Sequence, residues 1–285
     1  MNPRVTSFAD AVGQLPTPDG RRSMFIVDDP NLALKLYAPR GTDPQTPHAR
    51  DEIYIIAQGT AEFTSGAAPC GATACGAAAP GGDEHRVNVS PGDVLFAAAG
   101  VPHRFENFSD DFATWVMFYG PPVLYTDRLV LRMMSADDFE AYARIHGDDE
   151  TQRYLQGRGM TRDESYRSFS MLLGQWRIRG YGMWGVYEKE TNELVGRVGF
   201  FHPDGWPGFE IAWTIARDRW GRGYATEAAR RALRYAFEDL GQKHVISVIH
   251  PDNAASIAVA KKLGETFERE TEVMGRRAAI YGIDA

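Results

Sequence analysis

Short hydrophobic runs separated by turn residues fill the first 120 residues of the chain. Their lengths, and their β-branched and aromatic residues, are typical of strands, and the runs span residues 24–27, 32–37, 53–57, 61–64, 94–98 and 112–119. Turn sequences such as Ser90-Pro91-Gly92-Asp93 separate them. No convincing helical repeat lies between the runs. The pattern therefore predicts an all-β sandwich or barrel for this half.

The pattern changes after Pro121-Pro122, because prolines cannot continue a strand ladder. Helix-start signals at Ser135 and at Thr161, the latter a capping box, now alternate with hydrophobic runs. The predicted strands span 129–131, 182–188, 193–201, 210–216 and 245–249, and the clearest helices span 223–240 and 253–263. Alternating helices and strands indicate an α/β or α+β domain. The sequence therefore predicts two domains, 1–121 and 122–285.

Residues 65–82 consist almost entirely of Gly, Ala, Pro, Cys, Ser and Thr. Such a segment can bury little apolar surface, so we expect a flexible connection between two strands. It contains both cysteines of the chain, Cys70 and Cys75. Two free thiols are expected in a reducing compartment, and a disulfide is the weaker alternative.

Charge and hydropathy argue against several classes of protein. The net charge of -7 argues against nonspecific binding to nucleic acid or to membranes. No run approaches the roughly 18 apolar residues of a membrane span. The first 20 residues lack the apolar core of a signal peptide. We therefore expect a soluble cytoplasmic protein with no nucleic-acid or membrane partner.

A glycine turn lies between the predicted strand 210–216 and the predicted helix 223–240. It belongs to the stretch Trp220-Gly221-Arg222-Gly223-Tyr224-Ala225-Thr226-Glu227. The first backbone N–H groups of a helix lack partners within the helix, and the helix dipole adds partial positive charge there. Gly221 and Gly223 let the backbone approach a ligand, and Arg222 offers a planar fork for phosphate oxygens. The turn predicts a site for a phosphate-bearing cofactor.

From Leu129 to Ile283 the chain resembles the GNAT acetyltransferase family. The resemblance rests on Arg128-Leu129-Val130-Leu131-Arg132, on the glycine turn, on Asn253-Ala254-Ala255-Ser256 and on Lys262-Leu263-Gly264. It is strongest to the branch that includes the ribosomal-protein N-terminal acetyltransferases. Trp220 stands where the family usually has Gln or Arg, as is common in this branch. The resemblance implies an α+β fold with a mixed central sheet.

The resemblance also implies acetyl-CoA as the cofactor. Its pyrophosphate would bind the amides of Gly221, Arg222, Gly223, Tyr224, Ala225 and Thr226. Strand 213–216 would splay from its neighbour, so that free N–H groups of Trp213, Thr214 and Ile215 bond the pantetheine arm and the thioester carbonyl. Asn253 would bond the pantetheine amides. The acceptor would be a primary amine, on a small molecule or at a protein N-terminus.

The transfer needs a base for the amine and benefits from an acid for the thiolate. Glu210, at the start of the relevant strand, is the candidate base, and a solvated strand residue is the alternative interpretation. Ser256 is the candidate acid, against a helix-surface hydroxyl with a local role. Tyr281 is a weaker alternative acid. The tryptophans that would line an acceptor pocket, or else belong to the core, are Trp176, Trp184 and Trp206.

Two histidines and a carboxylate stand out in the first half. His48 and Glu52 are four residues apart, and an even spacing puts both side chains on one face of an extended chain. His103 follows a separate predicted strand and could approach the same point. Two histidines and one carboxylate suit Fe, Mn, Zn or Ni. The alternative is that these side chains only fill a polar interior.

This half resembles a cupin barrel. His48, Glu52 and Gly59 fit the first cupin motif, although Thr46 stands where the motif has its first histidine. The second motif fits at Gly92, Gly100, His103 and Asn107, with Ala98 where proline is usual. Three of the four family ligands are therefore present, and His85 is not a ligand by its spacing. The resemblance also raises the possibility of a homodimer.

Three interpretations of the whole chain stay open. The first is an acetyl-CoA-dependent N-acetyltransferase with an appended metal- or ligand-binding cupin. In the second, the cupin is a metal-dependent oxygenase or isomerase with its own activity. In the third, the protein senses a ligand and binds CoA without turnover. The acceptor depends on loops, here residues 155–162 and 201–208, whose composition names no substrate.

Overall fold

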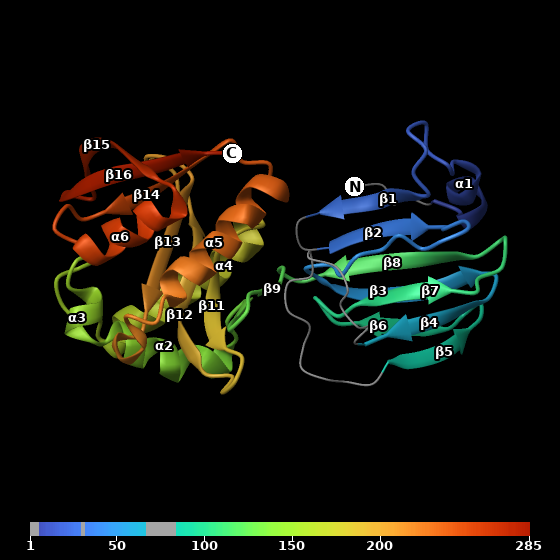
Figure 1. The fold of residues 1–285 in the computed structure, drawn as a ribbon, viewed down its shortest axis with the longest axis horizontal. Helices are drawn as coiled ribbons and strands as arrows, with labels where there is room; N and C mark the ends of the chain where they lie inside the picture. The colour runs from blue at the N-terminus through green and yellow to red at the C-terminus, as the bar shows by residue number, and fades with distance from the viewer. Residues whose placement is uncertain (1–5, 30–31, 67–83) are drawn as a thin grey trace. The chain divides into compact units, whose positions relative to one another are not determined.

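The computed structural model describes residues 6–29, 32–66 and 84–285. The predicted flexible segment, with Cys70 and Cys75, lies almost entirely outside the described residues. The chain divides into two compact units, Met1–Val123 and Leu124–Ala285, here called the N-terminal and C-terminal units (Figure 1).

The N-terminal unit consists of two antiparallel sheets. Its elements are α1 (Phe8–Gly13), β1 (Ser23–Asp29), β2 (Leu32–Tyr37), β3 (Asp51–Gln58), β4 (Ala61–Ser65), β5 (His85–Val89), β6 (Val94–Ala97), β7 (His103–Glu106) and β8 (Ala113–Tyr119). One sheet has the order β1-β2-β8-β3-β6, and the other has the order β5-β4-β7. The strands predicted from the sequence are confirmed, and β5, β7 and the short helix α1 are additions.

Aromatic and aliphatic side chains from both sheets form one core between them. Tyr54 of β3 packs against Phe63 of β4 and Phe105 of β7, with ring centroids 5.9 and 5.2 Å apart. A second cluster covers the outer face of the larger sheet, where Phe8 and Ala11 of α1 pack near Trp115. Alternate residues of β2 and β8 therefore serve two hydrophobic layers.

The C-terminal unit is built on a sheet with the order β15-β16-β14-β13-β12-β11-β10-β9. Its strands are β9 (Leu124–Tyr125), β10 (Leu129–Arg132), β11 (Met183–Glu188), β12 (Leu194–Phe201), β13 (Glu210–Ile215), β14 (His244–Ile249), β15 (Thr266–Val273) and β16 (Arg276–Asp284). Its helices are η1 (Ala136–Asp138), α2 (Phe139–His146), α3 (Asp149–Gln152), α4 (Arg162–Arg179), η2 (Arg217–Arg219), α5 (Tyr224–Glu238) and α6 (Ala254–Leu263). Only β13 and β14 pair in parallel, so the sheet is mixed, as predicted.

Helices cover both faces of this sheet. A core cluster joins α2 and α4 to the face that carries Met183 of β11. Trp184, the next residue along β11, meets Tyr235 of α5, with ring centroids 5.6 Å apart. Since successive strand residues point to opposite faces, α5 lies on the other face. The helix ends follow the sequence signals, because Thr161 caps α4 with Glu164 in a capping box.

Candidate functional site

The glycine turn leads directly into α5. Gly221 and Gly223 have φ angles of +75° and +82°, in the left-handed region that favours glycine. Gly223 is the N-cap residue of α5, and no side chain caps the first turn of the helix. The turn residues are exposed. The first amides of α5 are therefore open to an anionic ligand, with the exposed Arg222 beside them.

Side chains from distant segments hold this turn in place. Glu227, in the first turn of α5, accepts hydrogen bonds from the Thr126 hydroxyl at 2.6 Å and from the Arg128 backbone N–H at 3.0 Å. The Arg128 guanidinium lies 4.7 Å from the centroid of the Tyr224 ring. The Tyr224 hydroxyl donates to Glu188 at 2.8 Å. The start of α5 is thus fixed to the start of β10 and to the end of β11.

The strands β13 and β14 separate almost as soon as they meet. Their pairing consists of a single register pair, Glu210 with Ile246. On its other side β13 pairs with β12 along its whole length. The Ala216 N–H donates to the Val195 carbonyl of that neighbouring chain segment. The predicted splay is therefore present, between β13 and β14.

The alternation of an antiparallel ladder decides which amides face the gap. Because the Ala216 N–H points to β12, those of Thr214 and Ala212 do so as well, and those of Trp213 and Ile215 point to the gap. Among the predicted residues of this strand, Thr214 therefore directs its N–H away from the gap. Two donors, Trp213 and Ile215, are available there to a ligand that lies between the strands.

Two side chains bridge the strands where they part. The Ser247 hydroxyl of β14 lies 3.0 Å from the Ile211 carbonyl and 3.0 Å from Oε1 of Glu265. The Val248 N–H donates to Oε1 of Glu210 at 3.4 Å. These contacts close the narrow end of the gap.

Glu210 is buried, with only 6% of its surface exposed, so it is no solvated strand residue. The Trp206 indole N–H donates to its Oε2 at 2.7 Å. Burial raises the pKa of Glu210 to about 8, although the Trp206 and Val248 hydrogen bonds and the Arg197 charge oppose the rise. A carboxyl that titrates near neutral pH is suited to general-base catalysis.

Glu265 is a second buried carboxyl on the far side of Ser247, and sequence reasoning missed it. Burial raises its pKa to about 7, against the hydrogen bond from Ser247. Among the described residues its Oε2 has no hydrogen-bond partner. The Glu265 charge also contributes to the raised pKa of Glu210.

The predicted residues of α6 lie beside β13. Oδ1 of Asn253 accepts from the Ser256 N–H at 3.1 Å and so caps the helix. Trp213, Ile257 and Tyr281 belong to one apolar cluster that joins α6 to β13 and β16. The neighbouring Ser256 is half-buried. The structure thus brings the donor strand, Ser256 and Tyr281 into one region.

The predicted tryptophans divide between two roles. Trp176 and Trp184 are buried core residues with ring centroids 5.0 Å apart, so they line no open pocket. Trp206 differs, because it is only half-buried and binds Glu210. Its place in a Pro- and Gly-rich loop gave no sequence signal for that contact.

Two further contacts lie near the loops predicted to meet the acceptor. Nε of Arg197 donates to Nε2 of His146 at 3.0 Å, and burial and the Arg197 charge hold the pKa of His146 well below its usual range. Arg276 of β16 donates to the Leu155 carbonyl, and at 3.1 Å to the Gln156 carbonyl. The hairpin β15–β16, which the sequence patterns did not reveal, therefore anchors the 155–162 loop.

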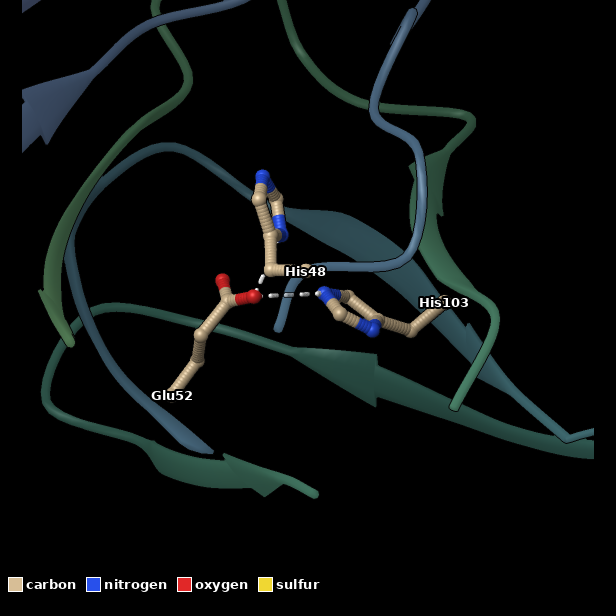
Figure 2. A group of neighbouring side chains, drawn as sticks. All are labelled: His48, Glu52 and His103. Carbon is tan, nitrogen blue, oxygen red and sulfur yellow. Dashed lines mark ion pairs between the residues drawn. The ribbon is translucent and has the colours of Figure 1, made fainter. Parts of the chain in front are cut away.

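In the N-terminal unit, His48, Glu52 and His103 converge as predicted (Figure 2). One possible ligand atom from each lies within 4.8 Å of the other two. Glu52 forms ion pairs with Nδ1 of His48 and, at 3.6 Å, with Nε2 of His103. Burial raises the pKa of Glu52, but its interactions with His103 and His48 outweigh burial and lower the pKa to about 2.

Neighbouring groups orient the three side chains. Nδ1 of His103 lies 2.8 Å from the Val101 carbonyl, an acceptor, so this nitrogen carries a proton and Nε2 is the ring nitrogen directed at Glu52. The Tyr54 hydroxyl lies 2.5 Å from Oε2 of Glu52 and 2.9 Å from Nε2 of His103. Thr46, at the position of the missing family histidine, is exposed.

Residues 6–29, 32–66 and 84–285 contain no helix with the length and apolarity that a membrane crossing requires.

Comparison with known proteins gives the class of the C-terminal unit. Residues 128–266 match the Acetyltransferase (GNAT) domain. The chain is 32% identical over 159 residues to the uncharacterized N-acetyltransferase YoaA of Bacillus subtilis (strain 168), covering 52% of this chain and 84% of YoaA. It is 31% identical over 163 residues to YkkB of the same organism, covering 55% of this chain and 93% of YkkB.

A solved structure gives the same result for the fold. An acetyltransferase from Agrobacterium tumefaciens str. C58 superposes with a TM-score of 0.54 at 29% identity, covering 59% of this chain and 96% of that chain. The chain belongs to the GNAT acetyltransferase family and is an acetyl-CoA-dependent N-acetyltransferase, which confirms the expectation from the sequence.

Proposed function

We propose that the C-terminal unit transfers the acetyl group of acetyl-CoA directly to a primary amine, on a small molecule or at a protein N-terminus, within a ternary complex. One observation carries the proposal. The strand β13 begins with a buried carboxyl, Glu210, and continues with amides that face a gap in the sheet. A base and carbonyl-binding donors therefore lie on one rigid element.

Acetyl-CoA would bind along the glycine turn and the gap. Its pyrophosphate would accept hydrogen bonds from the amides of residues 221–226, with Arg222 beside it. Its pantetheine arm would lie between β13 and β14, where the Trp213 and Ile215 N–H groups are directed. Asn253 would bond a pantetheine amide through its Nδ2, since its Oδ1 caps α6.

The chemistry requires the ammonium form of the amine to lose two protons and the leaving thiolate to gain one. Glu210, as carboxylate, accepts a proton from the amine, directly or through a water, and the neutral nitrogen attacks the thioester carbonyl. The new C–N bond forms, negative charge develops on the carbonyl oxygen, and the N–H donors of β13 stabilise that charge. The C–S bond then breaks, and the thiolate takes a proton from the Ser256 hydroxyl, or from Tyr281 as the alternative. The nitrogen gives up its second proton, which restores that hydroxyl through water.

We also propose that the N-terminal unit is a cupin that holds one divalent metal ion. His48, Glu52 and His103 would ligate Fe, Mn, Zn or Ni, and the ion would supply a Lewis-acid centre with open positions for a ligand. Nδ1 of His48 and Oε1 of Glu52 are in contact, but neither makes a hydrogen bond within the described part of the chain. Buried polar atoms left in this way are suited to a metal.

Incubation with acetyl-CoA and a panel of amines, with free thiol as the readout, tests the transferase. The panel should include polyamines, aminoglycosides and peptides with free N-termini. We expect thiol release with at least one amine, at a rate above that of hydrolysis alone. A Glu210→Gln variant is the control for background release. If no amine accelerates release over that variant, direct transfer by this site is wrong.

Metal analysis of the protein, purified without chelator, tests the cupin proposal. We expect a divalent ion bound in a ratio near one per chain. A content below about a tenth of the sites, with added Fe(II) not retained, would remove the basis for a metal site.

A further inference from the structure

Lys35 lies in the interior of the N-terminal sandwich, next to the three proposed ligands. On β2 the residues Ala33 and Tyr37, two before and two after it, belong to the core between the sheets. Alternation along the strand places Lys35 on the same face. It is the only lysine in residues 1–123 of the sequence.

The strand register fixes where its side chain begins. Lys35 pairs with Val116 of β8, and Val116 pairs on its other side with Tyr54 of β3. Glu52 occupies the next row of the same face, opposite Phe118. The Lys35 backbone is therefore two strands, roughly 10 Å, from that of Tyr54, a span that a lysine side chain largely covers.

The ammonium group ends beside the proposed ligands. Nζ lies 4.7 Å from the ring centroid of Phe118 and 5.5 Å from that of Tyr37. The Phe118 ring in turn packs edge-on against His48, with centroids 5.2 Å apart. The same phenyl ring thus contacts the lysine cation and one of the proposed metal ligands.

Lys35 forms no ion pair within the described part of the chain, although the charges of Glu52 and Asp43 act on it. Both carboxylates have other partners, and Glu52 interacts with His48 and His103. Asp43 accepts from the Phe105 N–H at 2.8 Å and from the Gln45 amide at 2.9 Å. Burial lowers the pKa of the Lys35 ammonium, and the charges of Glu52 and Asp43 do not restore it. A half-buried cation of this kind is stabilised by an anion.

The site opens on the side of Lys35 and His48. The Glu52 side chain is fully buried and that of His103 is 1% exposed, whereas the His48 side chain is 28% exposed. Lys35 is half-buried as well. A ligand would therefore meet the ammonium and the imidazole first, and the surrounding aromatic core limits it to a small molecule.

We propose that the N-terminal unit binds a small hydroxy- or oxo-carboxylic acid, with its carboxylate paired to Lys35 and its second oxygen directed at His48, Glu52 and His103. The inference rests on the proposed metal site for the second oxygen. Binding of the ligand's carboxylate depends on Lys35 alone and does not require the metal site. A charge-assisted hydrogen bond and an unpartnered cation together favour this acid over a neutral molecule of the same shape.

The full-length chain loaded with Co(II) tests the inference through its visible absorption. Lactate is the probe, lactamide is its neutral counterpart, and inorganic phosphate is the other small anion. We expect saturable spectral changes with lactate and none with lactamide. Lys35→Met should weaken lactate binding about tenfold or more at unchanged Co(II) content, and Lys35→Arg should keep most of the affinity. Arg104→Met, which removes a cation from the exposed rim of β7, should change nothing.

Each other result has a definite meaning. Equal affinity in the parent protein and in Lys35→Met, or equal binding of lactamide, overturns the inference. Binding of phosphate but not of lactate makes the ligand class wrong. If the parent protein takes up no Co(II), the metal proposal fails by itself. Calorimetry of the metal-free protein with lactate then decides: Lys35-dependent binding keeps the inference for the carboxylate, and no binding overturns it.

Discussion

The indole N–H of Trp206 donates a 2.7 Å hydrogen bond to Oε2 of Glu210. The donor comes from a loop, and the acceptor begins the strand that faces the gap in the sheet. This contact favours the ionised carboxylate, whereas burial favours the neutral acid. The balance between the two leaves the pKa of Glu210 at about 8, where it can act as a base.

Glu210→Gln should lower kcat by about 10² to 10⁴-fold, because the amide cannot accept the proton of the amine. In the parent protein a base with a pKa of about 8 is mostly protonated below that pH. We therefore expect kcat/KM to rise with pH and to level off above about pH 8. The Gln variant should keep only the slope due to ionisation of the acceptor itself. An identical pH profile in both proteins would rule out Glu210 as the base.

Trp206→Phe should shift the same inflection to higher pH. The lost hydrogen bond lowered the pKa of Glu210, so its removal raises that pKa by roughly one to two units. The rate at pH 7 should fall, while the rate well above the new inflection should recover. Trp115→Phe, in the N-terminal unit, is the matched control and should leave the profile in place. A loss of rate that is equal at all pH values would contradict this role for Trp206.

Gly223→Asp should abolish binding of acetyl-CoA, because the new carboxylate would face the pyrophosphate. The control is Gly241→Asp, since Gly241 also has a positive φ, of +64°, and open space around it, but follows the far end of α5. Calorimetric titration with CoA measures both. We expect affinity to drop by about a hundredfold or more in the first variant only. Unchanged affinity in Gly223→Asp would refute the assigned turn.

His103→Ala should remove the bound metal, since this imidazole supplies one of three proposed ligands. His85→Ala is the control on the same unit, because His85 lies exposed on β5. Elemental analysis of the purified variants gives the metal content. Acetyl transfer should continue in both if the two units work independently. A loss of transfer together with the metal, in a protein that stays folded by circular dichroism, would instead show that the units are coupled.

Glu265→Gln should flatten the pH dependence of stability of the C-terminal unit. The folded pKa of about 7 lies above the ordinary value of 4.5, so the folded state binds the extra proton between them. The stabilisation is complete below about pH 4.5 and is lost as the pH rises through 7, by about 3 kcal/mol in total. Urea unfolding at pH 5 and at pH 8.5, followed by tryptophan fluorescence, measures it. Equal pH sensitivity in parent and variant would contradict the assignment.

Much of the fold could be predicted because its signals are local. The strand 32–37 alternates between two buried layers, and α6 is marked by Asn253 at its start and Gly264 at its end. The hairpin β15–β16 was missed for a physical reason. Most side chains of β15 are exposed and polar, as in the stretch Glu268-Arg269-Glu270, so the strand lacks a hydrophobic period.

The residues of the candidate sites also differ in how far the sequence alone predicts them. Motifs or spacings that can be recognised in a single sequence include the glycine turn, Glu210 and the three proposed metal ligands. The contacts that tune them join residues far apart in the chain. Glu227 binds Thr126 across 101 positions, and Ser247 binds Glu265 across 18. Lys35 gave no signal, because only the strand register places it on the same face of the sheet as Glu52.

β13 pairs with β14 at a single position but with β12 along its whole length, so β12 sets the geometry of β13. Glu210 and Trp213 lie three residues apart on one strand, a distance of roughly 10 Å that the ladder to β12 holds constant. The proposed base and the proposed carbonyl donors thus keep their spacing whatever loops surround the acceptor. If residues 155–162 and 201–208 contact the acceptor, as the sequence predicts, insertions or substitutions there would change the acceptor preference without altering this spacing, in evolution or by engineering.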